Sequence, residues 1–218
     1  MAVTTQIKTQ NHSQHATNVA LSLNTDANRA EAENFVRQRF LKIHNADITN
    51  FMPYLVTLTK SDLQACVGIR PAAERLFVEQ YLDMPVESAH PALNIPREQI
   101  AEIGNLVSRN PHATLQLFVI IAKALHNAGI KELVFCATKQ VAKILKRAGA
   151  DLYPIVEADG ARMGDSLSEW GTYYDTSPTI MRLNVNSINE LINNSAILTK
   201  ISEKNAYEIA HIGQEFGA

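Results

Sequence analysis

The stretch from Gln99 to Ala128 constrains the fold more than any other part of the chain. Gln99–Ser108 is a largely apolar segment of strand length, and His112–Ala128 is an apolar run with helical spacing. Between them, Asn110 suits the N-cap of a helix and Pro111 suits its first position. The sequence therefore predicts a strand, a tight loop and a helix whose first N–H groups form an anion site beyond the strand.

Two polar residues interrupt this apolar strand, Glu102 and Asn105. Burying an isolated carboxylate is costly, so Glu102 needs a partner, an open face or a chemical role. In a regular strand the two side chains would face opposite sides, whereas a bulge at Gly104 would bring them together. Burial would raise the pKa of Glu102 toward the range of a general base. The alternative is a structural carboxylate that binds an arginine or a backbone group.

The composition bounds the class of protein. The length of 218 residues fits one large domain or a domain with a small appendage, and a net charge of -2 gives no reason to expect nucleic acid as a partner. Residues 1–16 are polar, do not resemble a secretory signal and are expected to form a disordered tail. The most apolar run, Leu115–Ala122, is too short to span a membrane.

The cysteines and histidines point to a cytoplasmic protein without a metal. Cys66 and Cys136 lie in apolar runs, which favours core packing in a reducing compartment, with a disulfide or a nucleophile as the alternatives. No Cys/His cluster has the spacing of a metal site.

The rest of the chain alternates between strand and helix patterns. Strands are expected at Thr17–Leu23, Pro53–Thr59, Leu63–Arg70, Glu132–Ala137, Asp151–Glu157 and Pro178–Asn184. Helices are expected at Ala27–Asn45, Glu74–Leu82, 139–148, Ile188–Asn193 and Glu203–Ile212, with irregular loops at 83–98 and 160–169. An antiparallel front half followed by a βαβ-like back half predicts an α/β protein with a mixed sheet covered by helices. We expect one domain over residues 17–184 and a helical extension over 185–218.

Four ordered blocks resemble the signature blocks of the bacterial thermostable hemolysin family. They are Phe51-Met-Pro-Tyr-Leu55, Glu79-Gln-Tyr-Leu82, Glu102-Ile-Gly-Asn-Leu106 and Trp170-Gly-Thr-Tyr-Tyr-Asp175, and the likeness runs from about Asn18 to Leu183. The element order resembles the GNAT-like (acyl-CoA N-acyltransferase) fold. That resemblance implies a central, partly splayed sheet with helices on both faces, in which one strand diverges from its parallel neighbour and a thioester enters the gap.

The central strand also resembles that of the acyl-homoserine-lactone synthases, a GNAT-like group. Those enzymes carry Glu followed by Ser-Arg, where this chain has Glu102-Ile-Gly-Asn105. Typical GNAT enzymes have a glycine-rich phosphate loop, whereas Val107–Pro111 contains no glycine. Both acyl-CoA and an acyl-carrier protein, whose thioester sits on a tethered arm, therefore remain possible donors, and the carrier protein would need that loop less.

The resemblance implies a site built from three groups of residues. Acyl transfer from a thioester needs a base for the amine, a donor for the oxyanion and an acid for the thiolate. The expected catalytic residues are Glu102, Asn105 and Tyr173. The expected thioester-binding residues are Leu106, Val107, Ser108, Arg109, His112 and Ala113. The expected acceptor-binding residues are Arg37, Phe40, Glu79, Tyr81, Trp170 and Tyr174, for which solvated charge or ordinary core packing is the alternative.

The expected function is transfer of a fatty acyl group to the amine of a small, amino-acid-like acceptor. Two alternatives stay open, a membrane-active hemolysin and a GNAT-like protein that binds acyl groups without turnover. The acyl length, the acceptor, the donor and the oligomeric state do not follow from the sequence.

Overall fold

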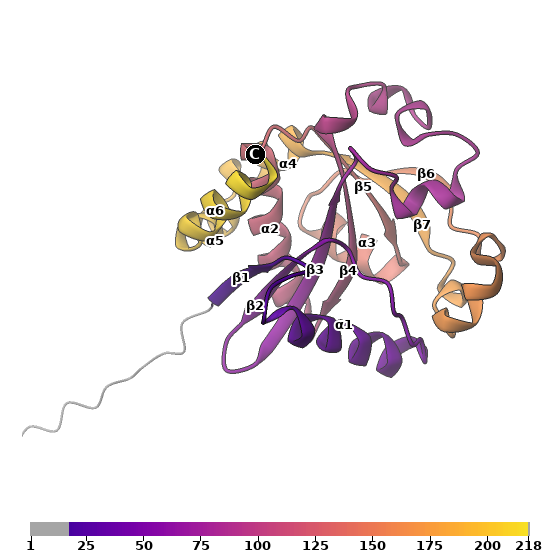
Figure 1. Ribbon diagram of the computed structural model, residues 1–218. Helices are drawn as coiled ribbons and strands as arrows, with labels where there is room; N and C mark the ends of the chain where they lie inside the picture. Colours follow the sequence, from indigo (N-terminus) through magenta and orange to yellow (C-terminus); the bar gives the residue numbers. More distant parts are fainter. Residues whose placement is uncertain (1–17, 218) are drawn as a thin grey trace, which may run out of the picture.

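The computed structural model describes residues 18–217 and shows a seven-stranded mixed sheet with helices on both faces (Figure 1). The strands are β1 (Asn18–Ser22), β2 (Tyr54–Thr59), β3 (Leu63–Pro71), β4 (Ile100–Ser108), β5 (Glu132–Ala137), β6 (Tyr153–Glu157) and β7 (Thr179–Asn184). The α-helices are α1 (Arg29–His44), α2 (Pro111–Asn127), α3 (Lys139–Arg147), α4 (Val185–Asn194), α5 (Ala196–Lys204) and α6 (Ala206–Phe216). The α/β class predicted from the sequence is confirmed, whereas the expected tail over residues 1–16 lies outside the described part of the chain.

The strand order is β1-β2-β3-β4-β5-β7-β6, and β4–β5 is the parallel pair among otherwise antiparallel neighbours. The front half is an antiparallel meander in which β2 and β3 form the predicted hairpin, whereas α1 lies between β1 and β2, and a segment of 3-10 turns lies between β3 and β4. The unit β4-α2-β5 crosses over to give the parallel pair, as a βαβ connection must. The antiparallel front half and the βαβ-like back half of the chain therefore meet at the β4–β5 pair, in the middle of the sheet.

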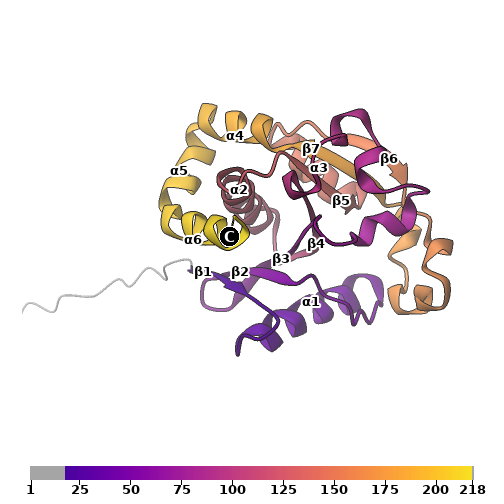
Figure 2. The same ribbon diagram turned by 45° about the horizontal axis from the view of Figure 1, so that its top comes forward.

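Both faces of the central strands are buried, which explains their nearly continuous apolar sequence. On β3, Ala65 and Val67 join the core formed with α2, whereas Cys66 joins the core formed with α1. Figure 2 shows α1 on one side of the sheet and α2 with α4, α5 and α6 on the other. Because α4–α6 cover the outer side of α2, that helix is buried on most of its circumference.

The predicted strand-loop-helix unit is confirmed as β4 and α2. Asn110 caps α2 by accepting a hydrogen bond from the N–H of Ala113 (2.9 Å), and Pro111 takes the first helical position. Helix α1 begins at Arg29 rather than Ala27, because the Asp26 carboxylate accepts from the N–H of Leu23 instead of capping the helix.

Three other segments differ from their sequence patterns. The expected helix over Glu74–Leu82 is a short 3-10 turn, η1 (Phe77–Tyr81), and the expected loops contain 3-10 turns, including η5 (Gly160–Trp170). The C-terminal segment forms three helices rather than two, because Asn184 and Ser195 each cap a new helix. No helix within residues 18–217 has the length and hydropathy required to cross a bilayer.

Candidate active site

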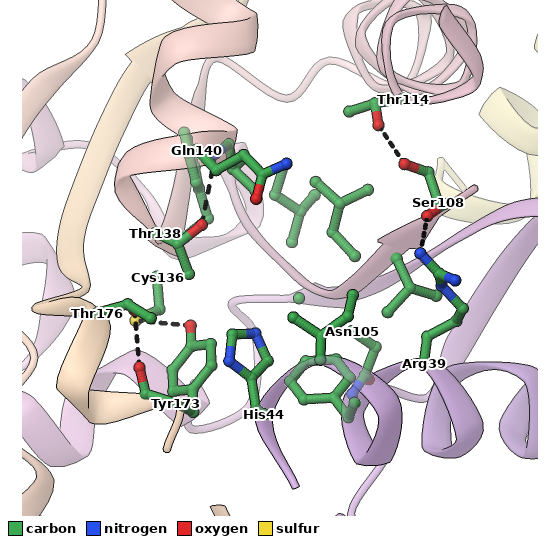
Figure 3. A pocket seen from close by; sticks show the side chains of 18 of the residues that line it. Arg39, His44, Asn105, Ser108, Thr114, Cys136, Thr138, Gln140, Tyr173 and Thr176 are labelled. Carbon is green, nitrogen blue, oxygen red and sulfur yellow. Dashed lines mark hydrogen bonds between the residues drawn. The ribbon is translucent and has the colours of Figure 1, made fainter. Parts of the chain in front are cut away.

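The parallel strands β4 and β5 pair over only four residues each. Ile100–Ile103 aligns with Glu132–Phe135, and after these positions the two strands part. A cavity of about 590 Å³ lies where they separate, and its wall includes β4 from Glu102 to Ser108. Figure 3 shows Asn105 and Ser108 on one side of this cavity and Thr138 and Gln140, at the start of α3, on the other.

A bulge shapes the part of β4 that has left β5. Two residues of β4, Asn105 and Leu106, stand opposite the single residue Val67 of β3, and Asn105 has a φ of 47°. The predicted distortion of this strand is therefore confirmed, one residue beyond Gly104. The glycine serves packing instead, since a Cβ there would lie 2.5 Å from the terminal methyl of Met52.

The Asn105 side chain holds the bulge against the segment that leads into β2. Its Oδ1 accepts from the N–H of Met52 (2.8 Å), and its Nδ2 donates to the carbonyl of Asn50 (3.4 Å). Both groups of the amide are thus engaged by backbone. Asn105 lines the cavity, and its contacts fix the shape of the wall.

Glu102 forms a buried, hydrogen-bonded part of the same wall. Its residue is 1% exposed, and its two carboxylate oxygens accept from the N–H groups of Phe77 (2.7 Å) and Val78 (2.9 Å) at the start of η1. Burial raises the pKa of the Glu102 carboxyl to about 7, although these two amides and the nearby Arg70 guanidinium act to lower it. The group can therefore exist in both protonation states near neutral pH.

A cluster of aromatic rings closes one end of the cavity. Phe40, Trp170 and Tyr173 lie with ring centroids 5.2–6.2 Å apart, and the His44 ring packs edge-on against Tyr173. The Tyr173 hydroxyl donates to the Sγ of Cys136 (3.5 Å). Burial raises the pKa of Tyr173 well above its ordinary value, so this hydroxyl keeps its proton.

The aromatic segment is anchored to the end of α1. Gly171 has a φ of 50°, and a Cβ there would lie 2.2 Å from the carbonyl oxygen of His44. The adjacent Thr172 donates to the same carbonyl through its N–H (2.7 Å) and its hydroxyl (3.1 Å). Only a glycine permits this close approach, which places Trp170 and Tyr173 against the cavity.

Arg39 and Arg109 flank the opposite end, near the start of α2. Arg39 donates to the carbonyl of Ser108 (2.8 Å), and the hydroxyls of Ser108 and Thr114 lie 2.6 Å apart. Arg109 donates to the carbonyl of Leu63 (2.6 Å) and pairs with the carboxylate of Asp62 (3.0 Å). Its charge is therefore already balanced.

The structure gathers most of the residues expected from the sequence around this cavity. Ten line it, namely Phe40, Tyr81, Glu102, Asn105, Leu106, Val107, Ser108, Arg109, Trp170 and Tyr173. Tyr174 lies just behind, with its hydroxyl 2.5 Å from that of Tyr81. Neither His112 nor Ala113 belongs to the wall.

Two of the expected acceptor-binding residues are used elsewhere. Arg37 is exposed and forms an ion pair with Asp47. Glu79 is buried away from the cavity, where it accepts from Arg97 (2.9 Å) and from the N–H of Val86 (2.9 Å). Glu79 thereby holds the proline-containing loop in place.

Several residues of the wall were not predicted from the sequence. His44 follows Phe40 by four residues on the buried stripe of α1, so helical spacing contained a signal for it. Thr138 caps α3 by accepting from the N–H of Val141 (3.4 Å), and for Cys136 the sequence favours core packing, with a disulfide or a nucleophile as the alternatives. For Arg39 the sequence left open a solvated surface position or contact with a substrate, because its place in the wall depends on how α1 lies across β4.

Solved structures with the same fold include an AHL synthase and an N-acyl amino acid synthase. The AHL synthase LasI matches with a TM-score of 0.57 at 12% identity, over 78% of this chain and 90% of that one. FeeM, an N-acyl amino acid synthase from uncultured soil microbes, matches with a TM-score of 0.56 at 15% identity, over 84% of this chain and 99% of that one. TofI in an apo form matches with a TM-score of 0.58 at 8% identity, over 83% and 99%. These likenesses show the GNAT-like fold.

The sequence itself was compared with protein families and with curated proteins. No curated protein matches it. The family model described as "Thermostable hemolysin" matches residues 23–188, which include all four signature blocks and the whole wall of the cavity. The resemblance seen in the sequence is thus confirmed, and the chain belongs to the thermostable hemolysin family.

Proposed function

We propose that this protein is an N-acyltransferase that moves a fatty acyl group from an acyl thioester to the amine of a small, amino-acid-like acceptor. The observation that carries this proposal is the parting of β4 from β5 beside Glu102. It opens a cavity to the middle of the sheet and sets a carboxyl with a pKa of about 7 in its wall.

The parted strand suits the thioester arm. Beyond Ile103, the edge of β4 that faces β5 has no strand partner, so its N–H and C=O groups are free to bind the amides of a pantetheine arm. Apolar side chains such as Leu106, Phe135 and Ile144 line the same space and suit a fatty acyl chain. Backbone N–H groups at the Asn105 bulge would stabilise the oxyanion that forms on the thioester.

Glu102 and Tyr173 would move the protons. The acceptor nitrogen attacks the thioester carbonyl, a C–N bond forms and the C–S bond breaks. Glu102 takes the proton that the amine loses, directly or through a water molecule. Tyr173 passes a proton to the departing thiolate while the proton taken up by Glu102 replaces it through water, so no free tyrosinate forms and the products are an amide and a free thiol.

A panel of acyl thioesters and amines tests the proposal. Free thiol is followed with a chromogenic reagent, and the amide is identified by its mass. Turnover should depend on both substrates and fall in the folded variant Glu102→Gln. Saturable thioester binding without thiol release would support the binding-only alternative instead.

The family description makes direct membrane lysis the other candidate to test. The most apolar helix of the described chain, α2, is enclosed by the sheet and by α4–α6, so it presents little apolar surface. We therefore expect purified protein to leave erythrocytes and liposomes intact without a thioester. Lysis under those conditions would favour the lysin, whereas lysis that needs thioester and amine would point to an amphiphilic product.

A further inference from the structure

Helix α3 has a basic surface beside the cavity. It contains four cationic residues, Lys139, Lys143, Lys146 and Arg147, and no acidic residue. All four are exposed, and their i, i+4, i+7, i+8 spacing places them on one face of the helix. In the part of the chain that the structure describes, none of them pairs with a carboxylate.

This basic face starts at the rim of the cavity. Lys139 lines the cavity together with Gln140, Val141 and Ile144, while the opposite side of α3 is buried in the core. From Lys139 to Arg147 the cations extend about 12 Å along the helix, at a rise of 1.5 Å per residue. The surface is therefore an extended strip and not a compact pocket.

Helix stability alone does not account for the strip. Cations in the last turn, such as Lys146 and Arg147, are favoured by the helix dipole. Lys139 stands in the first turn, where the dipole disfavours a positive charge. Its position at the rim therefore has a small local cost in stability, which an anionic partner would offset.

The nearby start of α2 is poorly equipped to bind a diphosphate. Pro111 has no N–H, and the N–H of Ala113 is already bound by the Asn110 side chain. The N–H of Thr114 is bound by the Asn110 carbonyl (3.3 Å), which leaves His112 as the free donor of the first turn. The Arg109 guanidinium pairs with Asp62, whereas Arg39, which donates to the carbonyl of Ser108, pairs with no carboxylate among the described residues. One such guanidinium, without a cradle of free backbone N–H groups, is a weak site for the diphosphate of a free coenzyme A.

We propose that the α3 strip is the docking surface for an acidic acyl-carrier protein, which delivers its acyl thioester into the cavity on a pantetheine arm. This inference rests on the proposed function. A carrier protein presents an extended acidic surface and keeps its phosphate at the base of the arm, so it needs an extended basic strip and no diphosphate cradle. Complementary charge would speed association and make it sensitive to salt.

A charge-reversal experiment tests the docking surface. The variant Lys143→Glu/Lys146→Glu leaves the cavity wall intact, and Lys200→Glu/Lys204→Glu on α5, where both lysines are also exposed, is the matched control. Each protein is assayed with octanoyl- and hexadecanoyl-loaded bacterial acyl-carrier protein, and with the same acyl groups on free pantetheine and on coenzyme A. We expect the α3 variant to raise KM for the carrier-protein thioester at least tenfold, while its kinetics with acyl-pantetheine and those of the control stay within twofold of the wild type.

The outcomes separate docking from catalysis. If the α3 variant uses acyl-carrier protein as well as the wild type does, or if the wild type prefers acyl-CoA, the inference is overturned and the acyltransferase proposal stands. If the wild type turns over none of these thioesters, the acyltransferase proposal fails. In that case the docking surface is tested separately, by the binding of holo-carrier protein to the immobilised wild type and to the α3 variant. Salt-sensitive binding that the α3 variant loses would support the docking surface, and any other result would overturn it.

Discussion

Replacing Glu102 with glutamine tests the energetics and the chemistry of one buried carboxyl. The pKa rises from an ordinary value of 4.5 to about 7 in the folded protein, chiefly because of burial. At 1.36 kcal/mol per pH unit, this difference corresponds to about 3 kcal/mol. Between pH 4.5 and 7 the folded state holds a proton that the unfolded state releases, so stability must fall as the pH rises.

The expected measurement is a difference between two stability curves. Wild type and Glu102→Gln are unfolded in urea at a series of pH values from 4.5 to 8.5 at constant ionic strength. The other titrating groups are common to both proteins, so the subtraction isolates Glu102. The free energy of unfolding of the wild type, minus that of the variant, should fall by about 3 kcal/mol from pH 4.5 to 7 and then stay level.

The same variant tests the proposed base. If Glu102 must be deprotonated to act, kcat/KM of the wild type should rise with pH through an apparent pKa near 7, and the variant should lose about 10²- to 10⁴-fold in rate. Glu132→Gln is the control, since Glu132 is a buried carboxylate on β5 that pairs with Arg182 outside the cavity. It should lower stability without changing the shape of the pH–rate profile. A folded Glu102→Gln protein with normal turnover, or a stability difference that is flat with pH, would refute the reasoning.

Three further substitutions probe the rest of the wall. Tyr173→Phe should slow thiol release about tenfold with little change in KM, and an unchanged rate would remove Tyr173 as the acid. Gly171→Ala should lower the free energy of unfolding in urea by at least about 2 kcal/mol, because its Cβ meets the carbonyl of His44; an unchanged midpoint would contradict the close approach. Asn105→Ala leaves the N–H of Met52 without its acceptor and should cost about 1–3 kcal/mol in the same assay, and an unchanged midpoint would show that this hydrogen bond does not hold the bulge.

Local sequence signals predicted the backbone of this site better than its side-chain contacts. The Asn110 cap and Pro111 located the start of α2, and the apolar run before them located β4, because capping and strand patterns act over a few residues. The partners of Glu102 gave no such signal. They are the backbone N–H groups of Phe77 and Val78, which lie 25 and 24 residues away in the sequence. Every residue type except proline has such an N–H group, so the identity of these two residues does not reveal the contact.

The position of the bulge illustrates the same limit. Gly104 predicts a distortion in β4, since glycine tolerates unusual backbone angles. The register against β3 and the hydrogen bond from Met52 place the bulge at Asn105, which adopts a φ of 47°. Asparagine accepts that conformation more readily than most residues, so the sequence permitted either position and only tertiary contacts chose between them.

A sheet that parts in its middle leaves backbone groups without strand partners, so other contacts must hold the gap open. The bulge at Asn105 turns β4 away from β5, and its side chain fastens the turned strand to the segment around Met52. The close approach of Gly171 to the end of α1 holds the Trp170 ring against Phe40 in the cavity wall. Each of these contacts stabilises a shape that the β4–β5 pairing alone would not adopt. A site that admits a substrate arm requires two strands that are held apart where they could otherwise pair. For this reason the separation of β4 and β5, more than any single side chain, supports acyl transfer.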